Sequence, residues 1–215
     1  MVKVKICGIT NAEDGFAAIS MGADYIGFVV EIGGSERSLD RREAALLVEQ
    51  LGGKAKTVVL TCLAGGREIA GLCSAIKPDA VQLVRDLPED EIFLLHHLVP
   101  KLLIMKTIPV KKGANALADA KRFEKFIDFA VLDSAAKGNL GGTGKKADWK
   151  SCREIAEQLR RPVFLAGGLA PGNVRKAIAA VKPYGVDVSS GVKLDNDKRK
   201  IDKEKLMKFI EGAKA

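Results

Sequence analysis

Two side chains that can transfer protons stand at the ends of apolar runs that are typical of strands. Cys7 ends a run at the start of the sequence, and Asp133 ends another run beyond its middle. A carboxylic acid can donate a proton and a thiolate can accept one, so the pair is suited to general acid–base catalysis. Each residue also has a simpler interpretation, because a buried cysteine packs as a small apolar residue and a strand-end aspartate often caps a turn.

Three glycine-rich segments follow apolar runs in the C-terminal part of the sequence and could hold an anion. Glycine lets backbone N–H groups approach an anion closely, and a helix N-terminus adds positive potential. In an eight-stranded α/β barrel, the loops after strands seven and eight form the usual phosphate site. The residues expected to bind phosphate are Gly142, Gly144, Gly167, Gly168, Ser189, Ser190 and Gly191.

Other kinds of site are disfavoured. The first glycine-rich segment is not a P-loop, because Lys146 follows Lys145 where the P-loop has Ser or Thr. The two histidines, His96 and His97, are adjacent and cannot share one helix face. The four cysteines show no zinc-binding spacing. We therefore expect neither nucleotide hydrolysis nor a metal site.

Strand-like and helix-like segments alternate along the whole sequence. The expected strands are 2–7, 24–30, 56–61, 80–83, 102–107, 126–132, 162–166 and 185–188. The expected helices are 12–21, 41–51, 68–76, 89–98, 114–125, 149–159, 172–181 and 203–213. Eight such units predict an α/β protein of the parallel eight-stranded (β/α)8 TIM barrel class, with residues 1–215 forming a single domain. An open doubly wound sheet is the alternative.

A barrel would bring the two proton-transfer residues together. The first and sixth strands are three positions apart in an eight-stranded ring, so Cys7 and Asp133 should face each other across its mouth. Strand alternation points Lys5 into the barrel with Cys7, and the neighbouring last strand carries Asp187. We predict that Lys5 and Asp187 pair below Cys7, where a cation would favour the thiolate.

Composition and charge narrow the possible environment and partners. No apolar run is long enough to span a membrane, and residues 1–5 are typical of a strand and not of a signal peptide. These features predict a cytoplasmic protein with reduced cysteines. The net charge of +8 could suit a nucleic-acid binder, but only 5% of residues are aromatic and acidic residues interrupt the basic stretches. We expect a phosphorylated small-molecule substrate, no nucleic acid, no membrane, and a monomer or homodimer.

Several motifs, in order, resemble those of the phosphoribosylanthranilate isomerase family. They are Lys-Ile-Cys-Gly-Ile-Thr at 5–10, Gly-Ala-Asp at 22–24, Ser-Glu-Arg at 35–37, Ala-Val-Gln-Leu at 80–83, Leu-Asp-Ser at 132–134, Gly-Gly-Thr-Gly-Lys at 141–145, Leu-Ala-Gly-Gly-Leu at 165–169 and Val-Asp-Val-Ser-Ser-Gly-Val at 186–192. The resemblance extends over nearly the whole sequence, and the first and the last three motifs are highly specific in combination.

The resemblance implies an isomerase of tryptophan biosynthesis that performs an Amadori rearrangement without a cofactor. Its substrate would be N-(5-phosphoribosyl)anthranilate, and its product 1-(2-carboxyphenylamino)-1-deoxyribulose 5-phosphate. By matched position, Asp133 would be the general acid and Cys7 the general base. Arg37 would hold the anthranilate carboxylate, and the glycine-rich segments would hold the phosphate.

Departures from the family pattern keep alternatives open. Val84 and Arg85 stand where the family has His-Gly, and Lys193 stands where it often has glutamate. Within the third strand, residues 57–61 lack the common Gly-Val-Phe, and the loop 31–34 is also unusual. One alternative is therefore a related barrel isomerase that acts on a different aminosugar phosphate. Another is a non-catalytic paralogue that binds a phosphoribosyl ligand, although retention of Cys7 and Asp133 argues against it.

Overall fold

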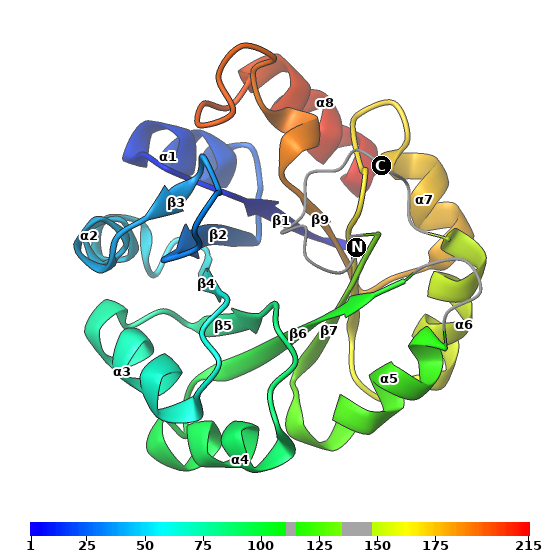
Figure 1. The fold of residues 1–215 in the computed structure, drawn as a ribbon. Coiled ribbons are helices and arrows are strands. Elements are labelled where there is room, and N and C mark those ends of the chain that lie inside the picture. The colour runs from blue at the N-terminus through cyan, green and yellow to red at the C-terminus, as the bar shows by residue number, and fades with distance from the viewer. Residues whose placement is uncertain (111–114, 135–147) are drawn as a thin grey trace.

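The computed structural model describes residues 1–110, 115–134 and 148–215, and its strands close into a barrel (Figure 1). In chain order the strands of the ring are β1 (Lys3–Cys7), β2 (Tyr25–Val30), β4 (Lys56–Thr61), β5 (Ala80–Leu83), β6 (Leu103–Pro109), β7 (Phe129–Asp133), β8 (Val163–Leu165) and β9 (Gly185–Val188). Neighbouring strands are parallel, and β1 pairs with both β9 and β2, which closes the ring. The predicted parallel eight-stranded barrel is confirmed, and the open sheet is excluded.

Helices surround the ring of strands on the outside (Figure 1). They are α1 (Ala12–Ser20), α2 (Arg41–Leu51), α3 (Gly66–Ile76), α4 (Glu89–Leu98), α5 (Ala116–Phe123), α6 (Trp149–Gln158), α7 (Val174–Val181) and α8 (Lys203–Lys214). Within the described ranges, none of these helices has the length and apolar character required to cross a bilayer. That residues 1–215 form a single domain stays a prediction.

Apolar side chains fill two layers, one on each face of the strands. The larger layer lies between strands and helices and includes Val4 and Ile6 of β1. The smaller layer fills the barrel interior, where Tyr25 of β2 and Phe164 of β8 meet edge to face with ring centroids 5.2 Å apart. Because strand residues alternate between these layers, Lys5 and Cys7 face the barrel interior while Val4 and Ile6 face the helices.

Short elements account for most differences between the predicted and observed segments. The two-residue strand β3 (Ser38–Leu39) pairs with β2, and η2 (Ser190–Val192) is a single 3₁₀ turn after β9. Neither is long enough to show a periodic pattern in sequence. Residues 126–128 were expected in the sixth strand, but the 3₁₀ turn η1 (Glu124–Phe126) extends α5 and β7 begins later.

Candidate active site

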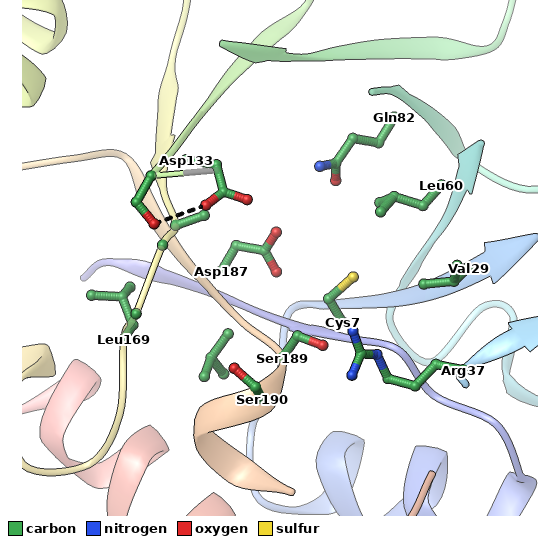
Figure 2. A pocket seen from close by; sticks show the side chains of 15 residues that line it. Cys7, Val29, Arg37, Leu60, Gln82, Asp133, Leu169, Asp187, Ser189 and Ser190 are labelled. Atoms are coloured by element: carbon green, nitrogen blue, oxygen red, sulfur yellow. Dashed lines mark hydrogen bonds between the residues drawn. The ribbon is translucent and has the colours of Figure 1, made fainter. Parts of the chain in front are cut away.

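The carboxyl-terminal ends of the strands surround a pocket (Figure 2). Most of the site residues predicted from sequence line it, namely Cys7, Arg37, Asp133, Gly167, Gly168, Ser189 and Ser190. Gly191 is not among the lining residues. Gly142 and Gly144 lie outside the described residues. The barrel therefore gathers side chains from both ends of the sequence at the face where enzymes of this fold carry their active sites.

Cys7 and Asp133 lie on opposite sides of the pocket (Figure 2). Two strands, β9 and β8, separate β1 from β7 around the ring, as the strand count predicted. The Val110 amide donates a hydrogen bond of 2.7 Å to the Asp133 carbonyl and so fixes the Asp133 backbone. The Ser134 hydroxyl lies 3.5 Å from Asp133 Oδ1. A ligand between the two strand ends would meet a thiol on one side and a carboxyl group on the other.

Lys5 and Asp187 form a buried ion pair inside the barrel. Their backbones are paired in register between β1 and β9, and Lys5 Nζ lies 2.8 Å from Asp187 Oδ2. Burial disfavours the ammonium, but Asp187 and then Cys7 outweigh it and raise the pKa of Lys5 above its ordinary value. The predicted pair is confirmed, and Lys5 stays charged at neutral pH.

The Cys7 thiol is harder to ionise than its neighbouring cation suggested. Burial is the largest influence and raises its pKa, while Lys5 lowers it and Asp187 raises it again. The net result is a pKa above the ordinary thiol value. Lys5 does favour the thiolate, as expected from the sequence. Desolvation of the buried sulfur has a larger effect in the opposite direction.

Gly27 of β2 leaves space for both the thiol and the ammonium. A Cβ atom at this position would lie 3.2 Å from Cys7 Sγ and 3.3 Å from Lys5 Nζ. Asp187 also lines the pocket, and its Oδ1 is buried without a hydrogen-bond partner among the described residues. This carboxylate oxygen can accept a hydrogen bond from a ligand hydroxyl.

Arg37 reaches the pocket from the loop between β2 and β3. Glu31 and Arg41 fix the base of this loop through a two-pronged ion pair, with Arg41 Nε 2.6 Å from Glu31 Oε1. The Arg37 side chain packs against Gly8, and its Nε is buried without a hydrogen-bond partner among the described residues. A guanidinium held in this way can bind a carboxylate with its free donors.

The loops after β8 and β9 pack backbone against backbone. Gly167 and Gly168 adopt left-handed φ values of 82° and 66°. A Cβ atom at Gly167 would lie 2.5 Å from the Ser134 amide nitrogen, and one at Gly191 would overlap the Leu169 carbonyl oxygen. Gly191 therefore serves the site by letting the two loops meet, although it does not line the pocket. The result is a glycine- and serine-lined end suited to an oxyanion.

No metal site was found in the described part of the chain. No group of three or more His, Cys, Asp or Glu side chains there is placed to hold a metal ion. The pocket lining offers a thiol at Cys7 and a carboxyl group at Asp133, both able to exchange protons with a bound ligand, and Lys5, Asp187 and Arg37 place charges nearby.

Comparison with known proteins identifies the family. The sequence model of N-(5'phosphoribosyl)anthranilate (PRA) isomerase matches residues 4–212. The chain belongs to this family. The isomerase of Methanocella arvoryzae is 39% identical over 212 residues, which cover 98% of this chain and 97% of that protein.

Solved structures of family members agree with this assignment. Phosphoribosyl anthranilate isomerase from Thermotoga maritima superposes with a TM-score of 0.85 and 32% identity, covering 100% of this chain and 99% of that one. A second phosphoribosyl anthranilate isomerase, in complex with reduced 1-(o-carboxyphenylamino)-1-deoxyribulose 5-phosphate, has a TM-score of 0.82 and 31% identity, with coverage of 100% and 99%. This chain is thus a TIM-barrel isomerase.

Sequence reasoning missed two buried polar residues near the pocket. Gln82 of β5 lines it and donates a hydrogen bond of 3.0 Å to the Thr107 hydroxyl. Lys193 was noted only as a departure from the family pattern, yet its side chain is fully buried. Gln82 could have been found from the sequence, because it is a polar residue within a strand of apolar ones. Nothing local in the sequence indicated that Lys193 is buried.

Proposed function

We propose that this chain uses Cys7 and Asp133 to convert N-(5-phosphoribosyl)anthranilate into 1-(2-carboxyphenylamino)-1-deoxyribulose 5-phosphate. The reaction is an Amadori rearrangement and belongs to tryptophan biosynthesis. Family membership supports the reaction, and the opposed thiol and carboxyl group across one pocket carry the proposal. The compound bound in the related complex is described as the reduced form of this product.

The first step opens the sugar ring. The Asp133 carboxylic acid donates its proton to the furanose ring oxygen, and the bond between C1 and that oxygen breaks. The nitrogen lone pair forms a C1=N double bond, which gives an iminium ion and a free C4 hydroxyl. Asp133 suits this role because it ends β7 at the pocket, opposite the base.

The second step moves a proton from carbon. The Cys7 thiolate removes the proton on C2, the released pair forms a C1=C2 bond, and the iminium nitrogen becomes a neutral amine. Loss of the C2 hydroxyl proton and protonation at C1 then give the ketone. Lys5, 2.8 Å from Asp187, is charged beneath Cys7 and favours the thiolate against the burial that opposes it.

The two ends of the substrate carry negative charge, and each end of the pocket has groups that can bind an anion. Arg37 would hold the anthranilate carboxylate through its guanidinium donors. The loops that contain Gly167, Gly168, Ser189 and Ser190 would hold the phosphate. This arrangement fixes C1 and C2 of the sugar between acid and base, which makes proton transfer effectively intramolecular.

The location and assembly of the protein are part of the same proposal. The cysteines Cys7, Cys62, Cys73 and Cys152 are free in the structure, which suits the reducing cytoplasm. A phosphorylated small molecule is the expected partner, and the chain is expected to act as a monomer or homodimer without nucleic acid.

Turnover by the purified chain tests this function. Freshly formed N-(5-phosphoribosyl)anthranilate should disappear, and in D₂O the product should carry deuterium at C1. Cys7→Ser and Asp133→Asn should each lower kcat by about 10²- to 10⁴-fold, the range for loss of a general acid or base. Cys62→Ser, a control outside the pocket lining, should keep native kcat. Near-native turnover by Cys7→Ser would show that Cys7 is not the base.

A further inference from the structure

Lys193 is a fully buried lysine just after η2, beside the carboxylate-binding end of the pocket. Its exposed fraction is 0%, and its Nζ donates a hydrogen bond of 2.6 Å to the Gly8 carbonyl oxygen. Among the described residues, no carboxylate forms an ion pair with it. A buried ammonium with a carbonyl as its partner is costly unless an anion is near for part of the protein's working cycle.

Gly8 lies directly between Lys193 and Arg37. Its backbone is left-handed, with φ of 76°, and its amide donates a hydrogen bond of 2.9 Å to the Gly27 carbonyl. A Cβ atom at Gly8 would lie 2.7 Å from Arg37 Cδ and 3.1 Å from Arg37 Nε. The Arg37 side chain therefore rests on the Gly8 backbone that Lys193 holds from its carbonyl side.

The segment 193–202 also contacts the backbone next to Arg37. Arg199 donates a hydrogen bond of 2.8 Å to the carbonyl of Glu36, the residue before Arg37. The segment is itself fixed by a bridge between Lys193 and Ile201 and by the Ile201 amide, 2.9 Å from Asp14 Oδ2. Of the two contacts, that of Lys193 is buried and that of Arg199 is exposed, so Lys193 is the stronger support.

We propose that Lys193 is a positioning residue that acts through Gly8 on Arg37 and makes this end of the pocket selective for an anionic ring substituent. The inference deepens the proposed function and rests on it, because it takes the carboxylate of the substrate as the anion at Arg37. Lys193 contributes in two ways. Its hydrogen bond fixes the surface on which Arg37 rests, and its charge adds to that of Arg37 within a poorly solvated region.

The charged groups around Lys193 are consistent with this role. The pKa of Lys193 is lowered to about 8, with burial as the largest influence and Arg37 acting in the same direction. Asp14 of α1, Cys7 of β1 and Asp197 raise it. Lys205 of α8 donates a hydrogen bond of 3.2 Å to the Lys193 carbonyl. Lys193 is therefore charged below about pH 8 and loses its charge as the pH rises through that value.

Kinetics with two substrates test the proposal. The substrates are N-(5-phosphoribosyl)anthranilate and N-(5-phosphoribosyl)aniline, which lacks the carboxylate. Lys193→Met should raise KM for the first substrate roughly tenfold, with kcat nearly unchanged and with KM for the aniline compound unchanged. Lys198→Met is the matched control, because the Lys198 ammonium donates to Leu194 within the same segment, and it should behave as the native chain.

Lys193→Arg separates charge from shape, and it should recover part of the lost affinity for the carboxylated substrate. The native chain gives an independent test that needs no variant. Its ratio of kcat/KM for the two substrates should fall as the pH rises through about 8, and titration of Cys7 cancels in this ratio. A Lys193→Met variant that weakens both substrates equally, or a ratio that stays constant with pH, would overturn the proposal. The proposed function fails separately, if the native chain does not turn over the carboxylated substrate.

Discussion

At Cys7, burial and charge act on the same thiol in opposite directions. Burial has the larger influence and raises the pKa, while the ammonium of Lys5 lowers it. The pair that Lys5 forms with Asp187 keeps the ammonium charged. The raised pKa keeps Cys7 mostly as the thiol at neutral pH, and it makes the thiolate a stronger base for the proposed removal of the C2 proton.

The ionisation of Cys7 can be measured directly. The rate of Cys7 alkylation by iodoacetamide should follow the fraction of thiolate. The midpoint, the pH at which this rate is half its maximum, should be higher for Cys7 than for free glutathione, because a free thiol has a pKa of about 8.5 to 9. In Lys5→Met/Asp187→Leu the midpoint should rise further, because Lys5 influences Cys7 more strongly than Asp187 does. Peptide mass spectrometry resolves Cys7 from the other cysteines. A native midpoint below that of glutathione would contradict this description.

Among the elements, the loop after β8 and the turn η2 form one unit at the proposed phosphate end. Gly191 in η2 contacts the backbone of Leu169 closely enough to exclude a Cβ atom. Asn173 ties the same loop together, accepting a hydrogen bond of 2.9 Å from Ala170 and donating one of 2.8 Å to Gly168. The proposed phosphate contacts therefore depend on how the two loops are packed against each other.

Gly191→Ala should weaken phosphate binding by forcing these loops apart. We expect KM for the substrate and the inhibition constant of inorganic phosphate to rise at least tenfold, with a stability loss of about 1–3 kcal/mol from overpacking. Gly172→Ala is the matched control, because a Cβ atom there meets no atom within 4 Å. Equal inhibition constants in Gly191→Ala and the native chain would show that the packing of η2 does not govern phosphate binding.

The sequence predicted the repeating elements well because their patterns are long and buried. The bounds of α2, β4, β5 and α4 agree with the predicted segments. Elements of two or three residues, such as β3 and η2, carry no periodic signal and were missed.

The same contrast holds for the candidate site. The opposition of Cys7 and Asp133 and the pairing of Lys5 with Asp187 followed from strand order and alternation. The burial of Lys193 depends on contacts with Gly8, which lies 185 positions away, and local sequence could not predict it.

For the whole molecule, the Lys5–Asp187 pair joins the first strand to the last. The two residues are 182 positions apart and meet where β1 and β9 close the ring. The pair is fully desolvated on the lysine side, so its main effect on stability appears when one partner is lost.

Removing one partner should therefore cost more than removing both. Lys5→Met should lower the free energy of unfolding by about 3–5 kcal/mol, because it leaves a buried carboxylate unpaired. Lys5→Met/Asp187→Leu should recover most of that loss, since two apolar side chains can occupy the interior. Urea unfolding at pH 7 gives the free energy of unfolding of the native chain, Lys5→Met and the double variant. A double variant that is no more stable than Lys5→Met would contradict this description of the pair.

Complementation tests the central claim most directly. A tryptophan auxotroph that lacks phosphoribosylanthranilate isomerase is transformed with the native chain, Cys7→Ala, Asp133→Asn or the control Cys62→Ser. The acid–base assignment predicts growth without tryptophan for the native chain and the control, and none for the two site variants at matched levels of folded protein. Failure of the folded native chain to restore growth would contradict the function, and growth of either site variant at the native rate would contradict the assigned roles.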